Sequence, residues 1–299
     1  MNTLKIHYIK KAIKNPKNAL YVAKVNIDQI TGRKLFNNDA GFRHNVLGKI
    51  SQLKTKKTID VKENSNQISE LGEKGYVSLG IPFKTTDIVN VISKYKQMIE
   101  NDDYSVVRAE YKNKVYSRMI YQVYKKIPEI TNLLTDEIKD MLKEHYKGNF
   151  QVHHVLAWRN YHVPPAVIEE KKLFASNWHC DGRDTSRVTL FINLSDVTED
   201  HGPLHVQSKQ RTKELIKMGF GGRHNYKLPE DVIEDPNFVV KNIGPPGTSV
   251  LCNPQLCLHR AGIPRPNKIR DIMEFRFKPS NQPLDKDWID KIDEENIAK

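Results

Sequence analysis

Apolar residues recur at helical spacing in two stretches of the chain. The first runs from Thr85 to Ile99, and the second runs from Thr135 to Gly148, where the glycine is suited to end a helix. In both stretches the apolar side chains fall three and four positions apart, which places them on one face of a helix. The sequence therefore predicts two amphipathic helices that pack on a core. The apolar face of the first consists of Ile88, Val91, Ile92, Tyr95 and Ile99.

Alternation of apolar and polar residues predicts the strands. Apolar residues occupy every second position from Val188 to Leu194, within the stretch 186–194, which is typical of a half-buried strand. From Arg270 to Phe277 the alternation puts Met273 and Phe275 on one face and Ile272 on the other. Further strands are predicted at 75–79, 151–161 and 244–252. The face opposite the apolar one in the stretch 270–277 carries Arg270, Ile272, Glu274 and Arg276.

Charge is distributed unevenly along the sequence. The chain has 299 residues and a formal net charge of +12. Its first 70 residues contain 12 Lys and 2 Arg against 5 acidic residues, a net charge of +9. Apolar residues between Leu20 and Ile30 distinguish this segment from a low-complexity tail. Three interpretations stay open: an arm packed on a folded core, a basic dock for an anionic partner, and a solvated face. No recognition motif accompanies the charge, which disfavours nucleic-acid binding.

Length and composition limit the class of protein. A chain of 299 residues can bury a large core. Its apolar runs are strand-sized, too short for a membrane-spanning helix, and its first residues lack the apolar region of a secretion signal. The three cysteines, Cys180, Cys252 and Cys257, have no paired spacing, so reduced thiols are expected. We therefore expect a cytoplasmic protein, and the sequence leaves its oligomeric state open.

His179, Asp181 and His259 are the residues most informative about chemistry. His179 and Asp181 are two positions apart, so in an extended segment both side chains project to the same side. Two imidazoles and one carboxylate are the ligand set of the triad that holds Fe(II) and leaves positions open. The His-x-Asp tripeptide alone is weak evidence, because a chain with 11 histidines can contain it by chance. The order of the surrounding strands and turns gives it weight.

From about Leu71 to Lys278 the chain resembles the phytanoyl-CoA dioxygenase-like family of Fe(II)/2-oxoglutarate oxygenases. The motifs that carry the resemblance occur in order: a Gly-Tyr-Val strand at 75–77, Trp-His-x-Asp at 178–181, a Gly-Pro-Leu turn at 202–204, a Gly-rich turn at 244–247, and an Arg eleven residues after the second His. The resemblance implies a mainly β fold with flanking helices (α+β), built on a double-stranded β-helix core of the jelly-roll, cupin-like type. We expect this oxygenase domain at 69–280, after a basic arm at 1–68 and before a polar tail at 281–299.

The same resemblance implies roles for individual residues. The Fe(II) ligands would be His179, Asp181 and His259. Arg270 would bind the distal carboxylate of 2-oxoglutarate, a task suited to a guanidinium fork. Thr189 lies where relatives place a hydroxyl that contacts the same carboxylate, although an ordinary strand threonine fits as well. The chain has Ala261 where some relatives have a serine that contacts the cosubstrate. Because Asp181 is a carboxylate, the halogenase branch, which has Gly or Ala there, is excluded.

The implied activity is hydroxylation of a small molecule by a dioxygenase that uses Fe(II), 2-oxoglutarate and O2 and releases succinate and CO2. The stretch from Lys209 to Lys227 contains six basic residues and a single acidic one, Glu214. This composition suits a mobile loop that covers an anionic substrate, and it fits a solvated loop equally well. The alternative function is a non-catalytic, metal-containing binding barrel or an oxygenase relative that lost turnover. A pairing of Arg270 with Asp271 or Glu274 would favour that alternative.

Overall fold

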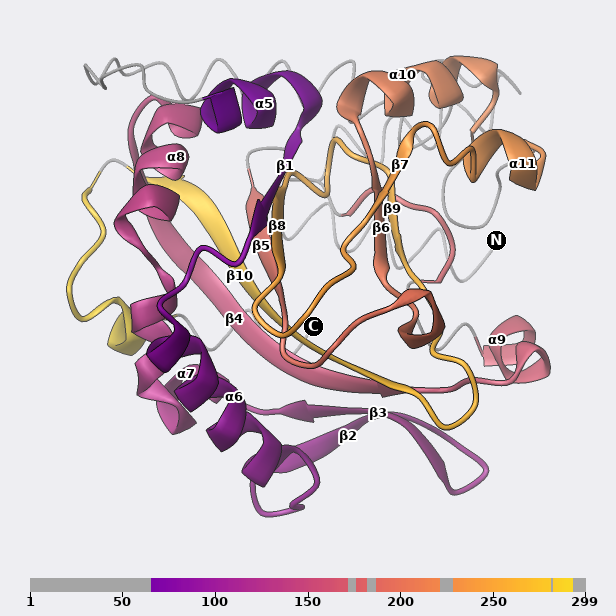
Figure 1. Cartoon of the computed structure of the whole chain (residues 1–299), viewed down its shortest axis with the longest axis horizontal. Helices are drawn as coiled ribbons and strands as arrows, with labels where there is room; N and C mark the ends of the chain where they lie inside the picture. The colour runs from indigo at the N-terminus through magenta and orange to yellow at the C-terminus, as the bar shows by residue number, and fades with distance from the viewer. Residues whose placement is uncertain (1–65, 172–175, 182–186, 221–227, 281, 293–299) are drawn as a thin grey trace, which may run out of the picture.

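The chain folds around two antiparallel sheets (Figure 1). The computed structural model describes residues 66–171, 176–181, 187–220, 228–280 and 282–292. The larger sheet has seven strands in the order β1-β8-β5-β10-β4-β3-β2, and the smaller sheet has three in the order β7-β6-β9. The strands are β1 (Tyr76–Gly80), β2 (Ser105–Tyr111), β3 (Lys114–Ile120), β4 (Asn149–Tyr161), β5 (Val188–Asn193), β6 (Leu204–Gln207), β7 (Val239–Lys241), β8 (Ser249–Cys252), β9 (His259–Ala261) and β10 (Ile269–Ser280). The prediction of a double-stranded β-helix is confirmed.

Helices cover one face of the larger sheet, while α10 and α11 lie beside the smaller sheet (Figure 1). The elements on the larger sheet are α5 (Asn66–Lys74), α6 (Thr85–Ile99), α7 (Val123–Lys126), α8 (Asp136–Tyr146) and the 3-10 helix η3 (Pro128–Leu133). The remaining elements are α9 (Pro165–Lys171), α10 (Lys209–Met218), α11 (Glu230–Ile233) and the 3-10 helices η4 (Glu199–His201) and η5 (Trp288–Lys291). This one-sided arrangement leaves the opposite face of the larger sheet to meet the smaller sheet.

Both predicted amphipathic helices are present. α6 has the predicted bounds, and its five predicted apolar residues are all buried. α8 begins after Thr135, whose hydroxyl accepts a hydrogen bond from the backbone N–H of Ile138 at 3.4 Å. It ends one residue earlier than predicted, because Lys147 rather than Gly148 takes the left-handed conformation, with φ 47°. Apolar periodicity therefore located the helices, while the terminal turn depended on local hydrogen bonds.

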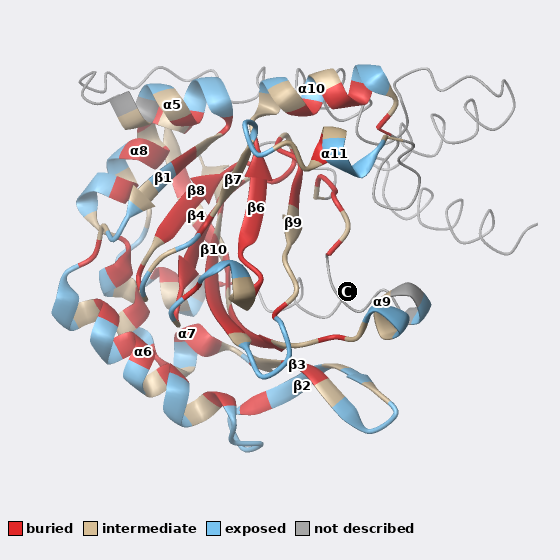
Figure 2. Cartoon of the chain, turned by 45° about the vertical axis from the view of Figure 1, so that its right-hand side comes forward, coloured by how far each residue is buried: buried red, intermediate tan, exposed pale blue. Residues whose placement is uncertain are grey.

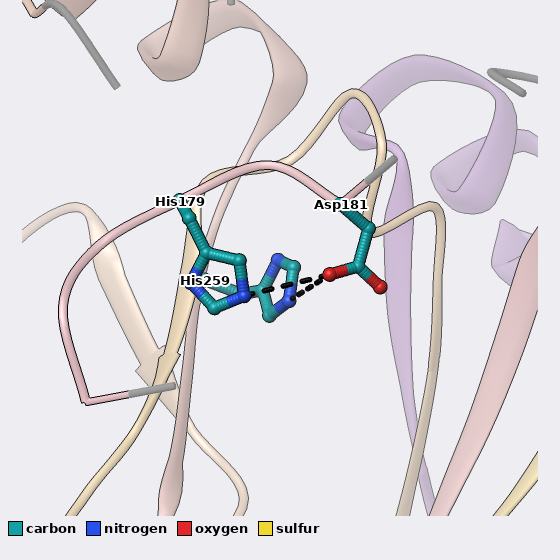
Figure 3. Close-up of side chains that lie close together, drawn as sticks. All are labelled: His179, Asp181 and His259. Carbon is teal, nitrogen blue, oxygen red and sulfur yellow. Dashed lines mark ion pairs between the residues drawn. The ribbon is translucent and has the colours of Figure 1, made fainter. Parts of the chain in front are cut away.

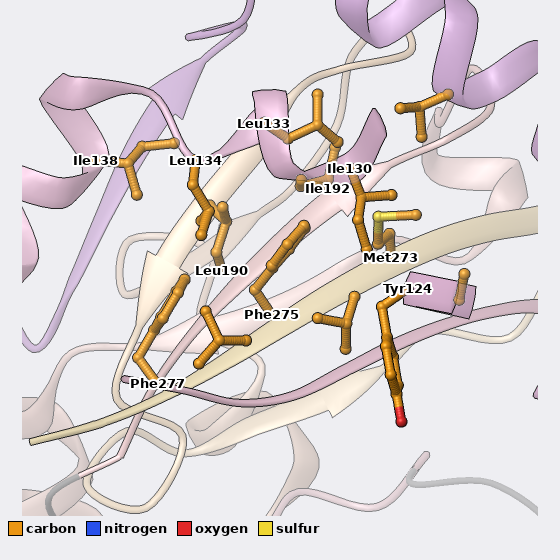
Figure 4. Close-up of a cluster of buried hydrophobic side chains, with 14 of the residues drawn as sticks. Tyr124, Ile130, Leu133, Leu134, Ile138, Leu190, Ile192, Met273, Phe275 and Phe277 are labelled. Atoms are coloured by element: carbon orange, nitrogen blue, oxygen red, sulfur yellow. The ribbon is translucent and has the colours of Figure 1, made fainter. Parts of the chain in front are cut away.

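The main hydrophobic core lies between the helices and the larger sheet (Figure 4). The alternation predicted for β10 is confirmed, since Phe275 and Phe277 lie in this core whereas Ile272 lies in a second cluster between the sheets. β5 differs from the prediction of a half-buried strand, because all six of its residues are buried. β6 of the smaller sheet is also buried throughout (Figure 2). The reason is that Phe191 on the inner face of β5 packs with Val206 of β6 in the smaller sheet. The space between the two sheets is thus enclosed.

A buried ion pair ties the long strands β4 and β10 to α6. Arg159 contacts both carboxylate oxygens of Asp271, with Nε–Oδ1 at 2.6 Å and Nη2–Oδ2 at 2.7 Å. The hydroxyl of Tyr95 on α6 donates to Asp271 Oδ1 at 3.1 Å. Burial alone would lower the pKa of Arg159, but pairing with Asp271 raises it. The charges are therefore neutralised on the helix-covered face, away from the space between the sheets.

The basic segment predicted as a mobile loop at 209–227 is a helix in its first half. Ser208 caps α10 by accepting a hydrogen bond from the backbone N–H of Arg211 at 3.1 Å, and Leu215 is buried in a cluster beneath it. The prediction of a loop is wrong for this half, because Thr212, Leu215 and Ile216 recur at helical spacing and are all buried. The helix ends at Gly219, with φ 115°, and residues 221–227 lie outside the described part of the chain.

The two ends of the chain differ in what the structure describes. Residues 1–65 of the predicted basic arm lie outside the described residues, so its three interpretations stay predictions. At the other end Trp288 and Ile292 belong to the main core, so the predicted polar tail packs onto the domain as far as residue 292. Among the described residues, no helix is long and apolar enough to cross a membrane.

Candidate metal centre and adjoining pocket

Three side chains that the sequence analysis proposed as metal ligands converge at one end of the space between the sheets (Figure 3). Oδ1 of Asp181 lies 3.4 Å from Nε2 of His179 and 3.6 Å from Nε2 of His259. Each residue offers one ligand atom, and these atoms all lie within 4.8 Å of one another. Ligand atoms that bind a divalent ion at about 2.1 Å lie about 3.0 Å apart at right angles and about 3.4 Å apart at tetrahedral angles. A small contraction would therefore enclose an ion.

Backbone pairing brings the three residues together from distant parts of the sequence. His179 and His259 form an antiparallel bridge in which each backbone N–H donates to the other residue's carbonyl at 3.0 Å. Side chains of directly opposed residues lie on the same face of a sheet, so the two imidazoles are neighbours. The backbone N–H of Asp181 donates to the carbonyl of Pro254 at 2.8 Å, which holds the carboxylate beside them.

Hydrogen bonds to the backbone orient both imidazoles. Nδ1 of His179 lies 2.8 Å from the carbonyl oxygen of Asn177, and Nδ1 of His259 lies 3.1 Å from that of Cys257. A carbonyl only accepts, so each Nδ1 carries the proton and each Nε2 presents its lone pair to the centre. Burial would raise the pKa of Asp181, but hydrogen bonds and charge from the two histidines outweigh it in the metal-free site and hold the pKa well below its usual value. Asp181 is therefore a carboxylate, and a metal ion bound at both Nε2 atoms would take the place of the protons there, which gives a ligand set of two neutral imidazoles and one carboxylate.

A charged network backs the two histidine strands on their outer surface, and the sequence analysis did not identify it. Oε1 of Glu234 accepts from Trp178 Nε1 at 2.5 Å and lies 2.9 Å from Nε of Arg260. The guanidinium of Arg260 also lies over the Trp178 ring, 5.6 Å from its centroid. Trp178 precedes one histidine and Arg260 follows the other, so this network joins both strands directly behind the ligands. From the sequence, Trp178 and Arg260 could be expected only to project to the face opposite the neighbouring histidines, because adjacent residues of a strand alternate. No sequence pattern marks Glu234.

Arg270 lies between the two sheets and is almost fully buried. Its Nη1 donates to the carbonyl of Gly202, at the start of the smaller sheet, at 2.5 Å. Its Nε is buried without a hydrogen-bond partner, and among the described residues no carboxylate pairs with it. Burial, with a smaller contribution from Arg108, lowers the pKa of Arg270 to about 10. The alternative pairing is wrong, because Asp271 pairs with Arg159 and Glu274 pairs with Arg276.

The neighbouring strand β4 presents alternate residues to this space. Asn160 lies opposite Arg270 in the register, and with its amide oxygen toward the pocket it accepts from Arg270 Nη2 at 2.9 Å and from Trp158 Nε1 at 3.2 Å. The sequence predicted a strand at 151–161 but not which of its side chains face the space between the sheets. The structure places Trp158 and Asn160 on the inner face and Arg159 on the helix-covered face.

Thr189 lies in the space between the sheets but at the other end of the wall from Arg270. On β5 it pairs with Arg276 of β10, six positions beyond Arg270. Six residues of extended chain span about 20 Å. Because 2-oxoglutarate is much shorter than this separation, Thr189 lies too far from Arg270 to contact the same carboxylate.

The three cysteines are buried, and none of them forms a disulfide bond. Cys252 and Cys257 lie in the cluster between the sheets, whereas Cys180 packs with Trp178 in the cluster beneath α10. Burial raises the pKa of Cys252 and Cys257, so both are neutral thiols at pH 7. Cys180 faces away from the candidate ligands, as its position between them predicted.

Several solved structures are similar to this chain, although neither a family model nor a curated protein sequence matches it. The non-heme alpha ketoglutarate dependent epimerase SnoN from nogalamycin biosynthesis is 11% identical, with a TM-score of 0.52 over 71% of this chain and 82% of SnoN. The corresponding carbocyclase SnoK is 16% identical, with a TM-score of 0.52 over 76% of this chain and 89% of SnoK. EctD from S. alaskensis is 16% identical, with a TM-score of 0.51 over 78% of this chain and 83% of EctD. At these identities the similarity establishes the shared jelly-roll fold.

Proposed function

We propose that the chain is an Fe(II)/2-oxoglutarate-dependent dioxygenase of the phytanoyl-CoA dioxygenase-like family, which hydroxylates a small molecule with O2 and releases succinate and CO2. The observation that carries the proposal is Arg270, a buried guanidinium with no carboxylate partner among the described residues, which contacts Gly202 beside β6, the strand that pairs with the His259 strand β9. A solved structure of SnoN holds Fe3+ and alpha ketoglutarate, and one of EctD holds 2-oxoglutarate.

The donor set fits Fe(II). Two imidazoles and one carboxylate are the ligands of non-haem Fe(II) oxygenases, and they leave coordination positions for other molecules. Under the proposal His179, Asp181 and His259 hold the ion, and the bound iron and 2-oxoglutarate together supply the oxidation chemistry. Outside the metal, the backbone carbonyls of Asn177 and Cys257 fix the imidazole tautomers.

Arg270 fits the distal carboxylate of 2-oxoglutarate. Its unpartnered Nε is the orphaned donor that a carboxylate would satisfy, and an anion would also offset the buried positive charge. Asn160 and the carbonyl of Gly202 hold the guanidinium in place from two sides. The apolar cluster between the sheets, which includes Trp158 and Phe191, limits access of water to the bound acid.

The alternative function is a barrel that binds a metal without catalysis, or an oxygenase relative without turnover. Arg270 weighs against a purely structural metal site, because a buried guanidinium without a counter-ion destabilises the fold unless it binds an anion. A relative that retained 2-oxoglutarate but lost turnover would keep the same side chains, so only an activity measurement separates it from the proposal.

The test is conversion of 2-oxoglutarate to succinate by the purified protein with Fe(II), ascorbate and O2, alongside titration of Zn(II) and 2-oxoglutarate in the absence of turnover. We expect micromolar to millimolar binding of 2-oxoglutarate that depends on the metal, and slow succinate formation without added substrate. Binding of both without succinate under any substrate would favour the inactive relative. Failure to bind both would refute the proposed function.

A further inference from the structure

A cavity of about 690 Å³ lies on the outer face of the smaller sheet, the face turned away from the candidate metal ligands. Residues of β6, β7 and β9, which lie side by side next to α11, line it (Figure 1). The face follows from alternation along β6: Val206 lies in the cluster between the sheets, so its neighbour His205 projects to the opposite side. A volume of this size is typical of cavities that hold small molecules. We call it the outer cavity.

Three side chains that carry nitrogen form a row across the floor of the outer cavity. In the register of the smaller sheet, His205 of β6 lies directly opposite Lys241 of β7 and directly opposite Arg260 of β9. All three residues line the cavity. Directly opposed residues share one face of a sheet with their Cβ atoms about 5 Å apart, so the row spans about 10 Å. The pairing of the backbone thus fixes the spacing of these groups.

Arg260 and His205 present hydrogen-bond donors that the described residues leave unused. Nε of Arg260 donates to Nδ1 of His205 at 3.2 Å, and neither Nη atom of Arg260 makes a hydrogen bond within the described part of the chain. Burial lowers the pKa of His205, so the imidazole is neutral at pH 7. Because its Nδ1 accepts from a guanidinium, its proton is on Nε2, which has no acceptor among the described residues. His205 is only 6% exposed, so a nearly buried donor lines the cavity without a protein partner.

The two carboxylates that line the outer cavity already have donors. Both oxygens of Glu199 accept from Nζ of Lys241, at 2.8 and 2.9 Å. Oε1 of Glu234 accepts from Trp178 and contacts Arg260, while its Oε2 lies 3.6 Å from Nδ1 of the imidazole, beyond hydrogen-bond distance. The lining therefore has a surplus of donors but no net charge. A matching ligand brings an acceptor with one negative charge, because both carboxylates would repel a second.

The remaining side chains of the lining are mainly apolar. Pro203, Pro236, Val239 and Ile263 line the same cavity as the row of donors. Burial of hydrocarbon against such side chains stabilises a complex, while the few polar groups orient the ligand. This lining suits a molecule with an apolar body and a single acceptor group at one end.

We propose that the outer cavity binds a small monocarboxylic acid with an aliphatic or aromatic body, at a site separate from the candidate metal centre. The two Nη atoms of Arg260 bind the carboxylate as a fork, and Nε2 of His205 donates a further hydrogen bond. Arg260 keeps its contact with Glu234 through Nε, so the ligand and the network behind the histidine strands are satisfied together. The inference does not rest on the proposed function, because neither donor residue is a candidate ligand of the metal or of 2-oxoglutarate.

The experiment titrates the full chain, saturated with Zn(II) and 2-oxoglutarate, and measures affinities by ligand-detected NMR. The probes are hexanoate and benzoate. Hexanamide and benzamide are the neutral analogues, and phenylphosphonate is an analogue with a second negative charge. Saturation with 2-oxoglutarate keeps the probe acids out of the position proposed for the cosubstrate.

The variants separate the two groups of donors. Arg260→Gln removes the guanidinium fork, His205→Phe removes the Nε2 donor and keeps an aromatic ring, and His205→Gln supplies an amide donor in its place. Arg265→Gln is the matched control, because Arg265 is exposed and pairs with Asp200 at the surface. Thermal unfolding and Zn(II) binding are measured first for each variant, since Arg260 belongs to the network behind the histidine strands.

We expect each acid to bind the wild type at least tenfold more tightly than its amide, a difference of about 1.4 kcal/mol. Arg260→Gln should weaken the acids at least tenfold and leave the amides unchanged. His205→Phe should weaken the acids roughly threefold or more, as expected for one hydrogen bond, and His205→Gln should restore most of this loss. Arg265→Gln should bind all probes as the wild type does.

Three results would overturn the inference. The first is equal binding of acids and amides by the wild type, and the second is unchanged binding of the acids by Arg260→Gln. Tighter binding of phenylphosphonate than of benzoate would overturn the assignment of a singly charged carboxylate. If Arg260→Gln does not fold, the two His205 variants decide, because equal affinities of both for the acids would exclude the Nε2 donor. A protein that binds neither Zn(II) nor 2-oxoglutarate refutes the proposed function instead, and the same titration without them still tests the outer cavity.

Discussion

Replacement of Arg270 by leucine removes the one buried cation that the described structure leaves without a counter-ion at the candidate centre. Leucine keeps much of the volume and fits beside Ile272 in the cluster between the sheets. The variant loses the hydrogen bonds from Arg270 to Gly202 and Asn160, but it does not alter the candidate metal ligands. The two functions assigned to this pocket, metal binding and cosubstrate binding, therefore respond differently to one substitution.

The expected loss of 2-oxoglutarate affinity follows from the energy of a charged hydrogen bond. Such a bond contributes about 1.5–3 kcal/mol, which corresponds to a Kd or KM raised about 10- to 150-fold. Arg270→Lys retains the charge but not the planar fork, so we expect an intermediate loss. Fe(II) or Zn(II) affinity should change little, since the guanidinium is not a ligand.

Although Arg270→Leu should weaken 2-oxoglutarate binding, it should not lower the thermal stability of the protein in the absence of 2-oxoglutarate. Burial lowers the pKa of Arg270 from 12.5 to about 10, so the charged form is disfavoured in the folded state. A lowered pKa in the folded state means that the charged Arg270 destabilises the fold. This destabilisation is fully present below about pH 10 and disappears as the pH rises from about 10 to 12.5. A shift of this size corresponds to roughly 3 kcal/mol at pH 7. Arg270→Leu should therefore melt at the same temperature as the wild type or higher in the absence of 2-oxoglutarate, because the lost hydrogen bonds offset part of the relief.

The measurements are calorimetric 2-oxoglutarate titration of the Zn(II)-loaded protein and thermal unfolding with and without the acid. Arg265→Leu is the matched control, because Arg265 is 74% exposed and pairs with Asp200 at the surface. It should leave 2-oxoglutarate binding unchanged. An Arg270→Leu protein that binds 2-oxoglutarate as tightly as the control would refute the cosubstrate assignment and leave the fold unaffected.

Three other substitutions test the surroundings of the centre. Asp181→Ala should weaken Fe(II) binding by at least 10- to 100-fold and abolish succinate formation, since loss of a ligand should cost at least as much as loss of an outer hydrogen bond; unchanged metal affinity in a titration would exclude Asp181 as a ligand. Glu234→Gln should weaken metal binding up to about tenfold, because the network behind both histidines loses its charge; a change only in thermal stability would assign Glu234 a purely structural role. Asp271→Asn should lower the free energy of unfolding by about 2–4 kcal/mol, because Arg159 loses its buried partner and keeps only the ion pair with the exposed Glu100, and a loss below about 1 kcal/mol in urea unfolding would contradict this.

Elements with strong periodicity could be predicted from the sequence. The apolar faces of α6 and β10 were identified residue by residue, because their burial follows directly from spacing along the element. The convergence of the three candidate ligands could also be anticipated, since the ordered motifs implied which strands would meet. In these cases the side chains that the local spacing places on one face are the same ones that the fold buries or brings together.

The remaining features depended on pairing between distant segments. The hairpin of β2 and β3 was not predicted, because its outward residues include Val106 and Val107, which remain exposed and blur the alternation. The position of Thr189 relative to Arg270 depends on the register between β5 and β10, which no local pattern specifies. Glu234 reaches its site from a segment with no motif of its own.

The alternation of β10 explains how one strand serves stability and chemistry at once. Asp271, Met273 and Phe275 face the helices, where the only charge is paired by Arg159 and the rest of the face is apolar. Their neighbours Arg270 and Glu274 face the space between the sheets, where Glu274 pairs with Arg276 and the buried Arg270 has no carboxylate partner among the described residues. Because neighbouring residues of a strand project to opposite faces, the charges of the pocket are held on a rigid backbone that the core anchors. The fold can therefore retain an unpaired buried cation for a ligand without loosening the sheet that positions it.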